Sequence, residues 1–234
     1  MIVAKQKEIE EIILSIKDFD RIAVAGCGVC VTVCMSGGEK EAENLTNLLA
    51  LTFNEKNENQ KHEINTEKSK PKTLTTTTPF RQCDMEFLDE CEKELENTDC
   101  ILSMACGAGV QFMAEKFPHK VIIPALNTSF IGVNRDLGYW TEMCQCCGDC
   151  VLEKTGGVCP VARCSKSHFN GPCGGSGDGK CEIDKETECG WQLIYERMKR
   201  LNQLEKLTKL ENIKDWSTGR DGGPRQMRRN DVTI

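Results

Sequence analysis

Residues 143–189 read MCQCCGDCVLEKTGGVCPVARCSKSHFNGPCGGSGDGKCEIDKETEC, and the fold of this half of the chain depends on them. Glycines and short polar runs separate the cysteines, and there is little apolar periodicity. Hydrophobic burial alone therefore cannot build a core here. Bound metal is the more economical support, because ligation free energy then becomes folding free energy. Nine of the sixteen cysteines lie in this segment, namely Cys144, Cys146, Cys147, Cys150, Cys159, Cys164, Cys173, Cys181 and Cys189.

The first cysteines of the segment have the spacing of an iron–sulfur binding loop. Cys144, Cys147 and Cys150 form C-x2-C-x2-C, by which one stretch of backbone can wrap three corners of a 4Fe-4S cluster. Cys159-Pro160 supplies the Cys-Pro pair of a ferredoxin run, but eight residues separate it from Cys150 where a bacterial ferredoxin has three. The spacing indicates a metal centre and leaves its fourth ligand open.

The remaining cysteines of the segment supply a second set of thiolates. The set consists of Cys164, Cys173, Cys181 and Cys189, with eight, seven and seven residues between successive members. With Cys144, Cys147, Cys150 and Cys159 they make eight thiolates, which is enough for two four-cysteine sites. Zinc also takes four thiolates, so at least one site could hold zinc rather than iron.

Redox compartment decides between metal binding and a disulfide scaffold. The first twenty residues, MIVAKQKEIEEIILSIKDFD, carry charges throughout and lack the apolar core of a signal peptide. No run has the length of a membrane span. We therefore expect a cytoplasmic protein, in which clustered cysteines bind metal. The net charge of -6 argues against a nucleic-acid surface, and three histidines are too few for a His-rich zinc active site.

Residues 1–135 show the alternating pattern of an α/β domain, a Rossmann-like parallel sheet of about four strands with helices. Residues 136–215 then form an irregular Cys-rich metal-binding module, which ends in a helix with an apolar stripe starting at Trp191. Residues 216–234 are expected to be a flexible tail. The expected strands are residues 21–25, 74–78, 101–105 and 121–125, and the expected helices are residues 5–19, 26–53, 86–95 and 107–116.

A parallel sheet would bring distant cysteines together. Cys27, Cys83 and Cys106 each follow a strand, and all strands of such a sheet deliver their carboxyl ends to one edge, where ligands bind. Cys30 and Cys34 follow on the next helix, whose N-terminus suits an anionic cluster. We therefore predict another metal site at this edge, with Cys34 as a small buried side chain in the alternative interpretation.

Three other features of the first domain are less informative about the site. Gly26-x-Gly28 resembles a dinucleotide fingerprint, but its third glycine position is Val31, so nucleotide binding has weak support. Cys91 and Cys100 are expected to be ordinary buried cysteines. The polar insert of residues 54–79 begins with a predicted solvated loop, NEKNENQKH, and whether its later part is ordered stays open.

Several stretches together resemble the MetV family, the small cysteine-rich subunits of iron–sulfur methylenetetrahydrofolate reductases. They are RIAVAGCGVCVTVCMSGGEKE, RQC, SMACGAGVQ and above all CGDCVLEKTGGVCPVARCSKSHFNGPCGGSGDGKCEID. The resemblance covers roughly residues 1–216. Its most specific part is Gly171–Gly175, and its weakest is the insert at residues 54–79.

The resemblance implies a cytoplasmic, non-catalytic subunit of an oxidoreductase complex. Its partner would be the flavin-bearing MetF-type subunit, which reduces 5,10-methylenetetrahydrofolate to 5-methyltetrahydrofolate in one-carbon metabolism, including the Wood–Ljungdahl pathway. One or more 4Fe-4S clusters in this chain would pass electrons from a donor, for which a further subunit is one candidate, to the partner's flavin.

Two alternatives accompany this expectation. In the first, the thiolates bind zinc and the chain is a structural subunit of the same complex without a redox role. In the second, Cys146-Cys147-Gly148 resembles the CCG motif of heterodisulfide reductases, which would make the chain a disulfide-reducing enzyme. Cys146 is more simply a spare thiol beside Cys147.

Overall fold

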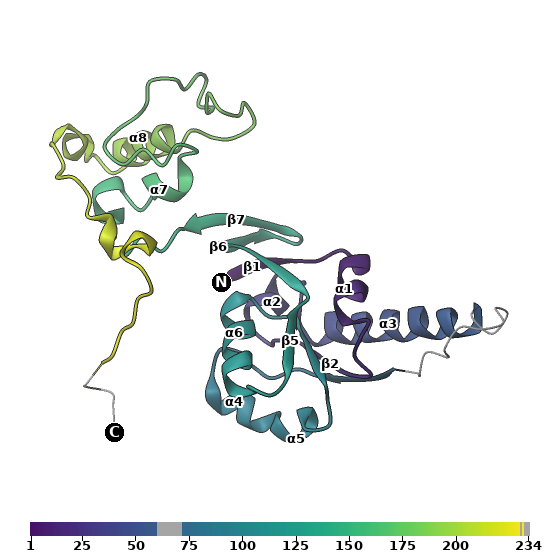
Figure 1. Ribbon diagram of the computed structural model, residues 1–234. Coiled ribbons are helices and arrows are strands. Elements are labelled where there is room, and N and C mark those ends of the chain that lie inside the picture. Colours follow the sequence, from purple (N-terminus) through teal and green to yellow (C-terminus); the bar gives the residue numbers. More distant parts are fainter. Residues whose placement is uncertain (60–71, 230, 232–234) are drawn as a thin grey trace. The chain divides into compact units, whose positions relative to one another are not determined.

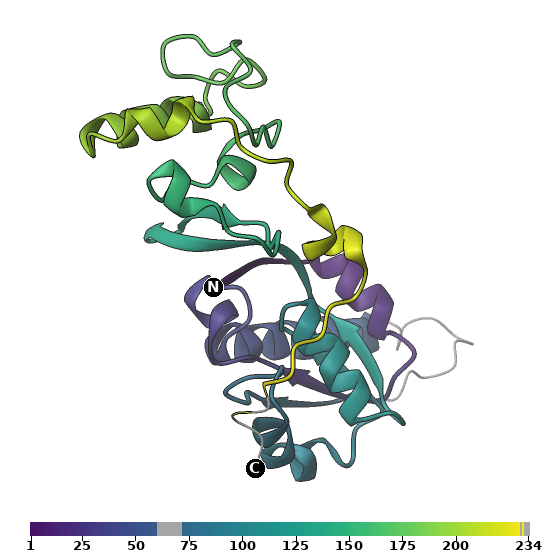
Figure 2. The same ribbon diagram turned by 90° about the vertical axis from the view of Figure 1, so that its left-hand side faces the viewer.

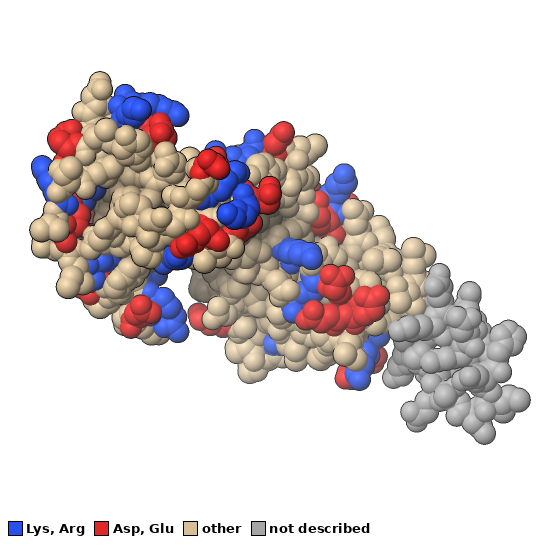
Figure 3. All heavy atoms as spheres, turned by 90° about the horizontal axis from the view of Figure 1, so that it is seen from above, with Lys and Arg blue, Asp and Glu red and all other residues tan. Residues whose placement is uncertain are grey.

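The computed structural model describes residues 1–59, 72–229 and 231. Its internal contacts divide the chain into two compact units, Met1–Thr141 and Glu142–Ile234. Within the described ranges, no helix has both the length and the apolar character to cross a membrane. On the face seen in Figure 3, acidic and basic side chains are interspersed.

A four-stranded parallel sheet forms the centre of the first unit, as the sequence predicts (Figure 1). The two strands in the middle of the sheet consist mostly of buried β-branched and small apolar residues. All three strand pairs are parallel. The order is β3 (Thr73–Thr77), β2 (Arg21–Ala25), β4 (Cys100–Ser103) and β5 (Val121–Pro124).

Helices cover both faces of this sheet (Figures 1 and 2). Alternate residues of a strand point to opposite faces, so Ile22 and Val24 pack in one core cluster and Ala23 and Ala25 in another. The first cluster includes residues of α1 (Ile9–Ile16) and α3 (Glu39–Asn59). The second includes residues of α4 (Met85–Glu90), α5 (Glu92–Leu95) and α6 (Gly107–Lys116). The mixed α/β fold predicted from the sequence is confirmed.

A second, antiparallel sheet was not predicted. It has the order β1 (Ile2–Gln6), β6 (Leu126–Asp136) and β7 (Tyr139–Cys144), and β1 pairs with β6 across most of its length. The helix expected over residues 5–19 therefore begins only at Ile9, because residues 2–6 are already paired as a strand. The partner of that strand lies more than 120 residues along the chain.

The single helix expected over residues 26–53 is divided. A short α2 (Cys30–Val33) is followed by a turn in which Met35 has a φ of 52°, and α3 starts after Gly38. A Cβ atom on Gly37 would lie 2.0 Å from the carbonyl oxygen of Met104, so this turn needs a glycine where it passes the sheet. The helix then continues to Asn59, through the start of the predicted loop. Residues 60–71 lie outside the described residues.

The second unit has little regular structure besides α8. Ile194 and Met198 of this helix are fully buried, whereas Tyr195 is exposed, so only part of the predicted apolar stripe packs on the unit. Short helical turns and irregular segments make the rest. The elements are η2 (Leu152–Thr155), α7 (Pro160–Arg163), α8 (Gly190–Arg200), η3 (Leu204–Thr208), η4 (Trp216–Thr218) and η5 (Arg220–Gly222).

Candidate metal centres

The first unit gathers cysteines at the carboxyl edge of its parallel sheet. Cys27 follows β2, Cys83 follows β3 and Cys106 follows β4, where it is the N-cap of α6. Burial raises the pKa of Cys27, and the charges of Cys83 and Cys106 raise it further, so the three thiols are close enough to interact. All three cysteines therefore follow strands at the carboxyl edge of the sheet.

Backbone amides supply part of the environment of Cys27. Its side chain is buried, with 8% of its surface exposed, and hydrogen bonds from the backbone of Gln82 and Val29 lower its pKa against the larger effect of burial. Amide donors of this kind stabilise a thiolate, whether it is free or bound to a metal.

Gln82 holds this edge together, and no local pattern in the sequence marks its role. Its side chain is completely buried. Nε2 donates to the carbonyl oxygens of Ala25 (2.8 Å) and Gly26 (2.7 Å), and Oε1 accepts from the Ser103 hydroxyl (2.6 Å). One amide thereby ties the ends of β2 and β4 to the segment that carries Cys83.

Cys30 and Cys34 differ in their surroundings. Cys30 is the first residue of α2 and is partly exposed. Cys34 is buried in the apolar core, where its Sγ lies 3.0 Å from Ser36 Oγ and 3.8 Å from the carbonyl oxygen of Ala4 in β1. The structure thus turns Cys34 toward β1. Cys91 and Cys100 are buried, as predicted.

In the second unit, residues 144–150 follow the end of β7 as an irregular segment that we call the cysteine loop. The amide of Cys146 donates to Cys144 Sγ (3.4 Å), and Cys147 Sγ lies 3.8 Å from the carbonyl oxygen of Asp149. Cys146 (φ 53°) and Gly148 (φ 85°) both adopt the left-handed conformation. Burial and then the neighbouring Cys144 raise the pKa of Cys146. Cys144, Cys146 and Cys147 are therefore close neighbours in this loop.

Residues 214–225, which we call the strap, lie against the cysteine loop. Three strap side chains donate to loop carbonyl oxygens. The donors are Lys214 Nζ to Asp149 (2.8 Å), Thr218 Oγ1 to Cys147 (2.9 Å) and Arg225 Nη1 to Cys146 (3.0 Å).

The strap also brings positive charge to the loop. The Lys214 side chain is 1% exposed, and its ammonium lies 5.5 Å from the centre of the Trp216 ring. The charge of Arg225 lowers the pKa of Cys146, against the larger effect of burial. Trp216, Thr218 and Arg225 of this packing lie within residues 216–234, which the sequence predicts to be a flexible tail.

Cys164, Cys173, Cys181 and Cys189 line one small cavity, which we call the four-thiol cavity. The last residue before α8 and the residue after α7 are two of these cysteines, so the two helices bring them together. The sequence showed eight thiolates without indicating how they divide. The structure groups the last four around one space.

Polar groups around the four-thiol cavity interact with its sulfur atoms. The amide of Gly175 donates to Cys173 Sγ (3.4 Å), and Cys173 Sγ lies 3.6 Å from a carboxylate oxygen of Glu182. The hydroxyl of Ser165, 3.5 Å from Cys181 Sγ, lowers the pKa of Cys181. Lys166 forms an ion pair with Glu182 beside them. The cavity therefore already offers hydrogen-bond donors and a cation to thiolates.

A cysteine is the N-cap residue of four of the described helices. Cys91 precedes α5, Cys106 precedes α6, Cys159 precedes α7 and Cys189 precedes α8. Cys159 Sγ accepts a hydrogen bond from the amide of Ala162 (3.4 Å), in the manner of a capping oxygen. Sulfur thus caps the first turn of α7, whereas the side chains of Cys91, Cys106 and Cys189 make no capping hydrogen bond.

The thiols of both units have the chemistry of metal ligands but not the geometry of a completed metal site. All sixteen cysteines are free, so no disulfide holds the Cys-rich segment together. Among the described residues, no three or more His, Cys, Asp or Glu side chains are arranged to hold a metal ion as they stand. The four-thiol cavity nevertheless has the donor number of a four-cysteine site, and amide-to-sulfur bonds of the observed kind accompany metal thiolates.

Residues 123–217 match a family model described as "Methylene-tetrahydrofolate reductase C terminal". The match covers less than half of the 234-residue chain, and it includes the cysteine loop and the four-thiol cavity but not Cys27, Cys83 or Cys106. No curated protein matches the chain. No solved structure matches it either. The match relates the Cys-rich region to methylenetetrahydrofolate reductases.

Proposed function

We propose that the chain is an iron–sulfur electron-transfer and docking subunit of a methylenetetrahydrofolate reductase complex. The observation that carries the proposal is the gathering of Cys164, Cys173, Cys181 and Cys189 around one cavity, in a region that matches this family. A bound metal cation would suit such a site, because without it like-charge repulsion keeps neighbouring thiols protonated, whereas a metal stabilises their thiolates.

The residues of the second unit would divide between two centres. Cys164, Cys173, Cys181 and Cys189 would hold one. Cys144, Cys147 and Cys150 of the cysteine loop would hold the other together with Cys159. A bound 4Fe-4S cluster would supply one-electron transfer. The chain's own contribution is to orient the sulfur atoms and to donate hydrogen bonds to them, from Gly175 in one site and within the loop in the other.

The edge of the parallel sheet is a candidate for a third centre. Cys27, Cys83 and Cys106 interact there, with Cys30 close by at the start of α2 and Cys34 turned toward β1. Gln82 fixes the ends of β2 and β4, from which Cys27 and Cys106 follow. This proposal rests on the placement of the thiols alone, because the family match does not reach them.

Reduction of the folate would take place on a partner. The described strands form two open sheets and neither is a barrel of the MetF type. A flavin on such a partner exchanges two electrons with the substrate, and one-electron centres in this chain would connect that flavin to a donor. The net charge of -6 and the interspersed surface charges fit a protein partner better than a nucleic acid.

Metal analysis tests the cofactor. We expect iron and acid-labile sulfide in chain produced anaerobically with full cluster assembly, together with the broad absorption of a cluster. Cys173→Ala and Cys147→Ala should each lose part of the iron, whereas Cys91→Ala should keep it, because Cys91 is buried in the apolar core of the first unit. Zinc in place of iron would favour the structural alternative and refute the electron-transfer role.

Association tests the partner. The chain should co-purify with a flavin-containing reductase subunit when both are produced together, and reduction of its clusters should be followed by reduction of that flavin. An iron-loaded chain that neither binds nor reduces such a subunit would contradict the docking role while leaving the metal assignment intact.

A further inference from the structure

We propose that the second unit contains a binding site for a small planar aromatic compound that carries a negative charge. The site is a cavity of about 430 Å³, which we call the tryptophan cavity. Its volume lies in the range of small-molecule sites. None of the cysteines lines it, so the inference is separate from the proposed metal centres.

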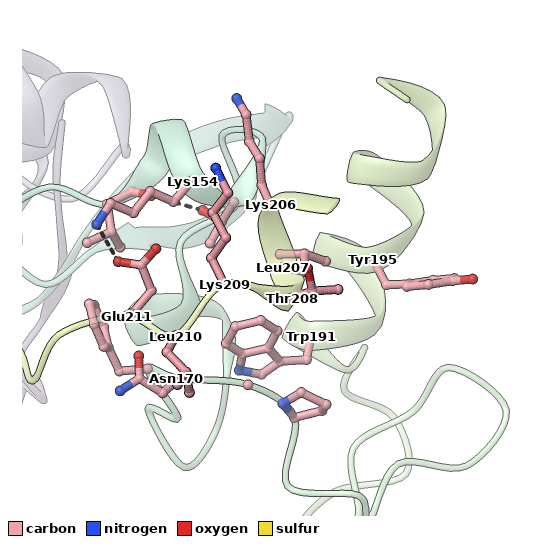
Figure 4. Close-up of a pocket in the computed structure, with 15 residues that line it drawn as sticks. Lys154, Asn170, Trp191, Tyr195, Lys206, Leu207, Thr208, Lys209, Leu210 and Glu211 are labelled. Carbon is pink, nitrogen blue, oxygen red and sulfur yellow. Dashed lines mark hydrogen bonds and ion pairs between the residues drawn. The ribbon is translucent and has the colours of Figure 1, made fainter. Parts of the chain in front are cut away.

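Four segments build the tryptophan cavity (Figure 4). One wall comes from η2 and includes the buried Thr155. A second comes from the loop of residues 169–172, and a third from the first turn of α8. The segment of residues 206–211 closes the fourth side. A site made by several segments of one compact unit does not depend on the other unit for its shape.

The aromatic part of the site is Trp191. Its Nε1 donates to the carbonyl oxygen of His168 (2.8 Å), which fixes the indole in one orientation before any ligand arrives. Phe169, Pro172 and Leu207 add apolar surface to the same cavity. A fixed indole beside apolar side chains favours a flat aromatic ring, which can stack on it.

The charged part of the site is basic. Lys154, Lys206 and Lys209 line the cavity with a single carboxylate, Glu211, which forms an ion pair with Lys154. Within residues 1–59, 72–229 and 231, the ammonium groups of Lys206 and Lys209 have no acidic partner. Figure 4 shows both side chains extending away from Trp191, so the aromatic wall and the free cations lie at different parts of the lining. This arrangement fits a ligand with a ring at one end and an anionic group at the other.

The site adjoins the four-thiol cavity. Trp191 and Pro172 line both spaces, so a ring stacked on Trp191 would be one side chain away from that cavity. Substitution of Trp191 would therefore disturb both sites. The variants that test the proposal lie elsewhere on the lining.

The test uses the full chain as purified and three probes: 2-naphthyl phosphate, 2-naphthol and inorganic phosphate. Isothermal titration should show saturable binding of 2-naphthyl phosphate with a dissociation constant below about 1 mM. The other two probes should each bind more weakly. The double variant Lys206→Gln/Lys209→Gln should weaken 2-naphthyl phosphate binding by about five- to tenfold, as expected for two partly exposed ion pairs, and leave 2-naphthol unchanged.

Two further variants make the result specific. Leu210→Asp places a carboxylate at the lining on a residue that is fully exposed, so it should weaken phosphate-ester binding without affecting folding. Lys199→Gln removes an exposed lysine of α8 that does not line the cavity, and it should have no effect. Absence of saturable binding, equal binding of inorganic phosphate, or equal affinity in the double variant and in Lys199→Gln would each overturn the proposal.

Discussion

Gln82→Leu should destabilise the first unit strongly, because the amide of Gln82 makes three buried hydrogen bonds that leucine cannot make. The carbonyl oxygen of Ala25 keeps the amide of Met104 (2.8 Å) as a partner. The carbonyl oxygen of Gly26 and the hydroxyl hydrogen of Ser103 lose theirs. A buried hydrogen bond contributes about 1 kcal/mol net, and each buried group left unpaired costs about 1–3 kcal/mol. We therefore expect a loss of about 3–4 kcal/mol in the free energy of unfolding.

Urea unfolding followed by the fluorescence of Trp140 measures this loss. Trp140 is the one tryptophan of the first unit, so a Trp191→Phe/Trp216→Phe background makes the signal specific to that unit. Gln111→Leu is the matched control, because the Gln111 side chain makes a single exposed hydrogen bond to Gly107. Its effect should stay within about 0.5 kcal/mol.

A double-mutant cycle with Ser103→Ala separates the hydrogen bond from general damage. Because Ser103 is one of the groups that Gln82→Leu leaves unpaired, the double variant should lose less stability than the sum of the two single variants. We expect a coupling of about 1 kcal/mol or more. Additive losses, or a loss for Gln82→Leu no larger than that of Gln111→Leu, would refute the role assigned to Gln82.

Three further predictions concern the cysteines and the strap. Thr218→Val removes a hydrogen bond to the cysteine loop, so the strap should become more accessible to limited trypsin digestion; unchanged cleavage rates would argue against the packing described. Gly148→Ala should weaken the second unit more than Gly157→Ala in thermal unfolding, because both have a positive φ but only at Gly148 would a Cβ atom meet the carbonyl of Thr218, at 2.1 Å. Burial raises the pKa of Cys100 to about 12, whereas an unfolded thiol titrates near about 8.5. The thiol of Cys100 therefore loses its proton at lower pH in the unfolded state than in the folded state. The free energy of unfolding should fall as pH rises between these two values, by up to about 1.4 kcal/mol per pH unit. Urea titrations at each pH should show a smaller fall for Cys100→Val.

The parallel sheet could be predicted because its strands carry their own signals. Residues 21–25 and 100–103 are short apolar runs, each followed by a turn that contains glycine and cysteine. The convergence of Cys27, Cys83 and Cys106 then follows from topology, since parallel strands share one carboxyl edge. Local pattern and global arrangement agree in this part of the chain.

The antiparallel sheet could not be predicted, because its first strand depends on a distant partner. Residues 2–6 have no strong strand pattern of their own and pair with β6. The helix predicted over residues 5–19 is present, but it starts at Ile9. Long-range pairing overrode the local preference at its first residues.

The arrangement of the candidate sites was predictable only in part. The spacing of Cys144, Cys147 and Cys150 identified the cysteine loop, since all its members are close in sequence. The four-thiol cavity depends on where α7 and α8 end and begin, which the spacing does not show. Gln82 was missed because nothing in a single sequence distinguishes a buried amide from an exposed one.

Two cysteines of the second unit couple sulfur chemistry to the start of a helix. Oxidation or alkylation of Cys159 would remove the cap of α7. The same change at Cys189 would enlarge a side chain of the small four-thiol cavity at the opening turn of α8, which leads to the buried Ile194 and Met198. Damage to one sulfur atom would thus spread as loss of helical order rather than stay confined to a vacant ligand position. Storage in air should for this reason lower the helical circular-dichroism signal along with the thiol content.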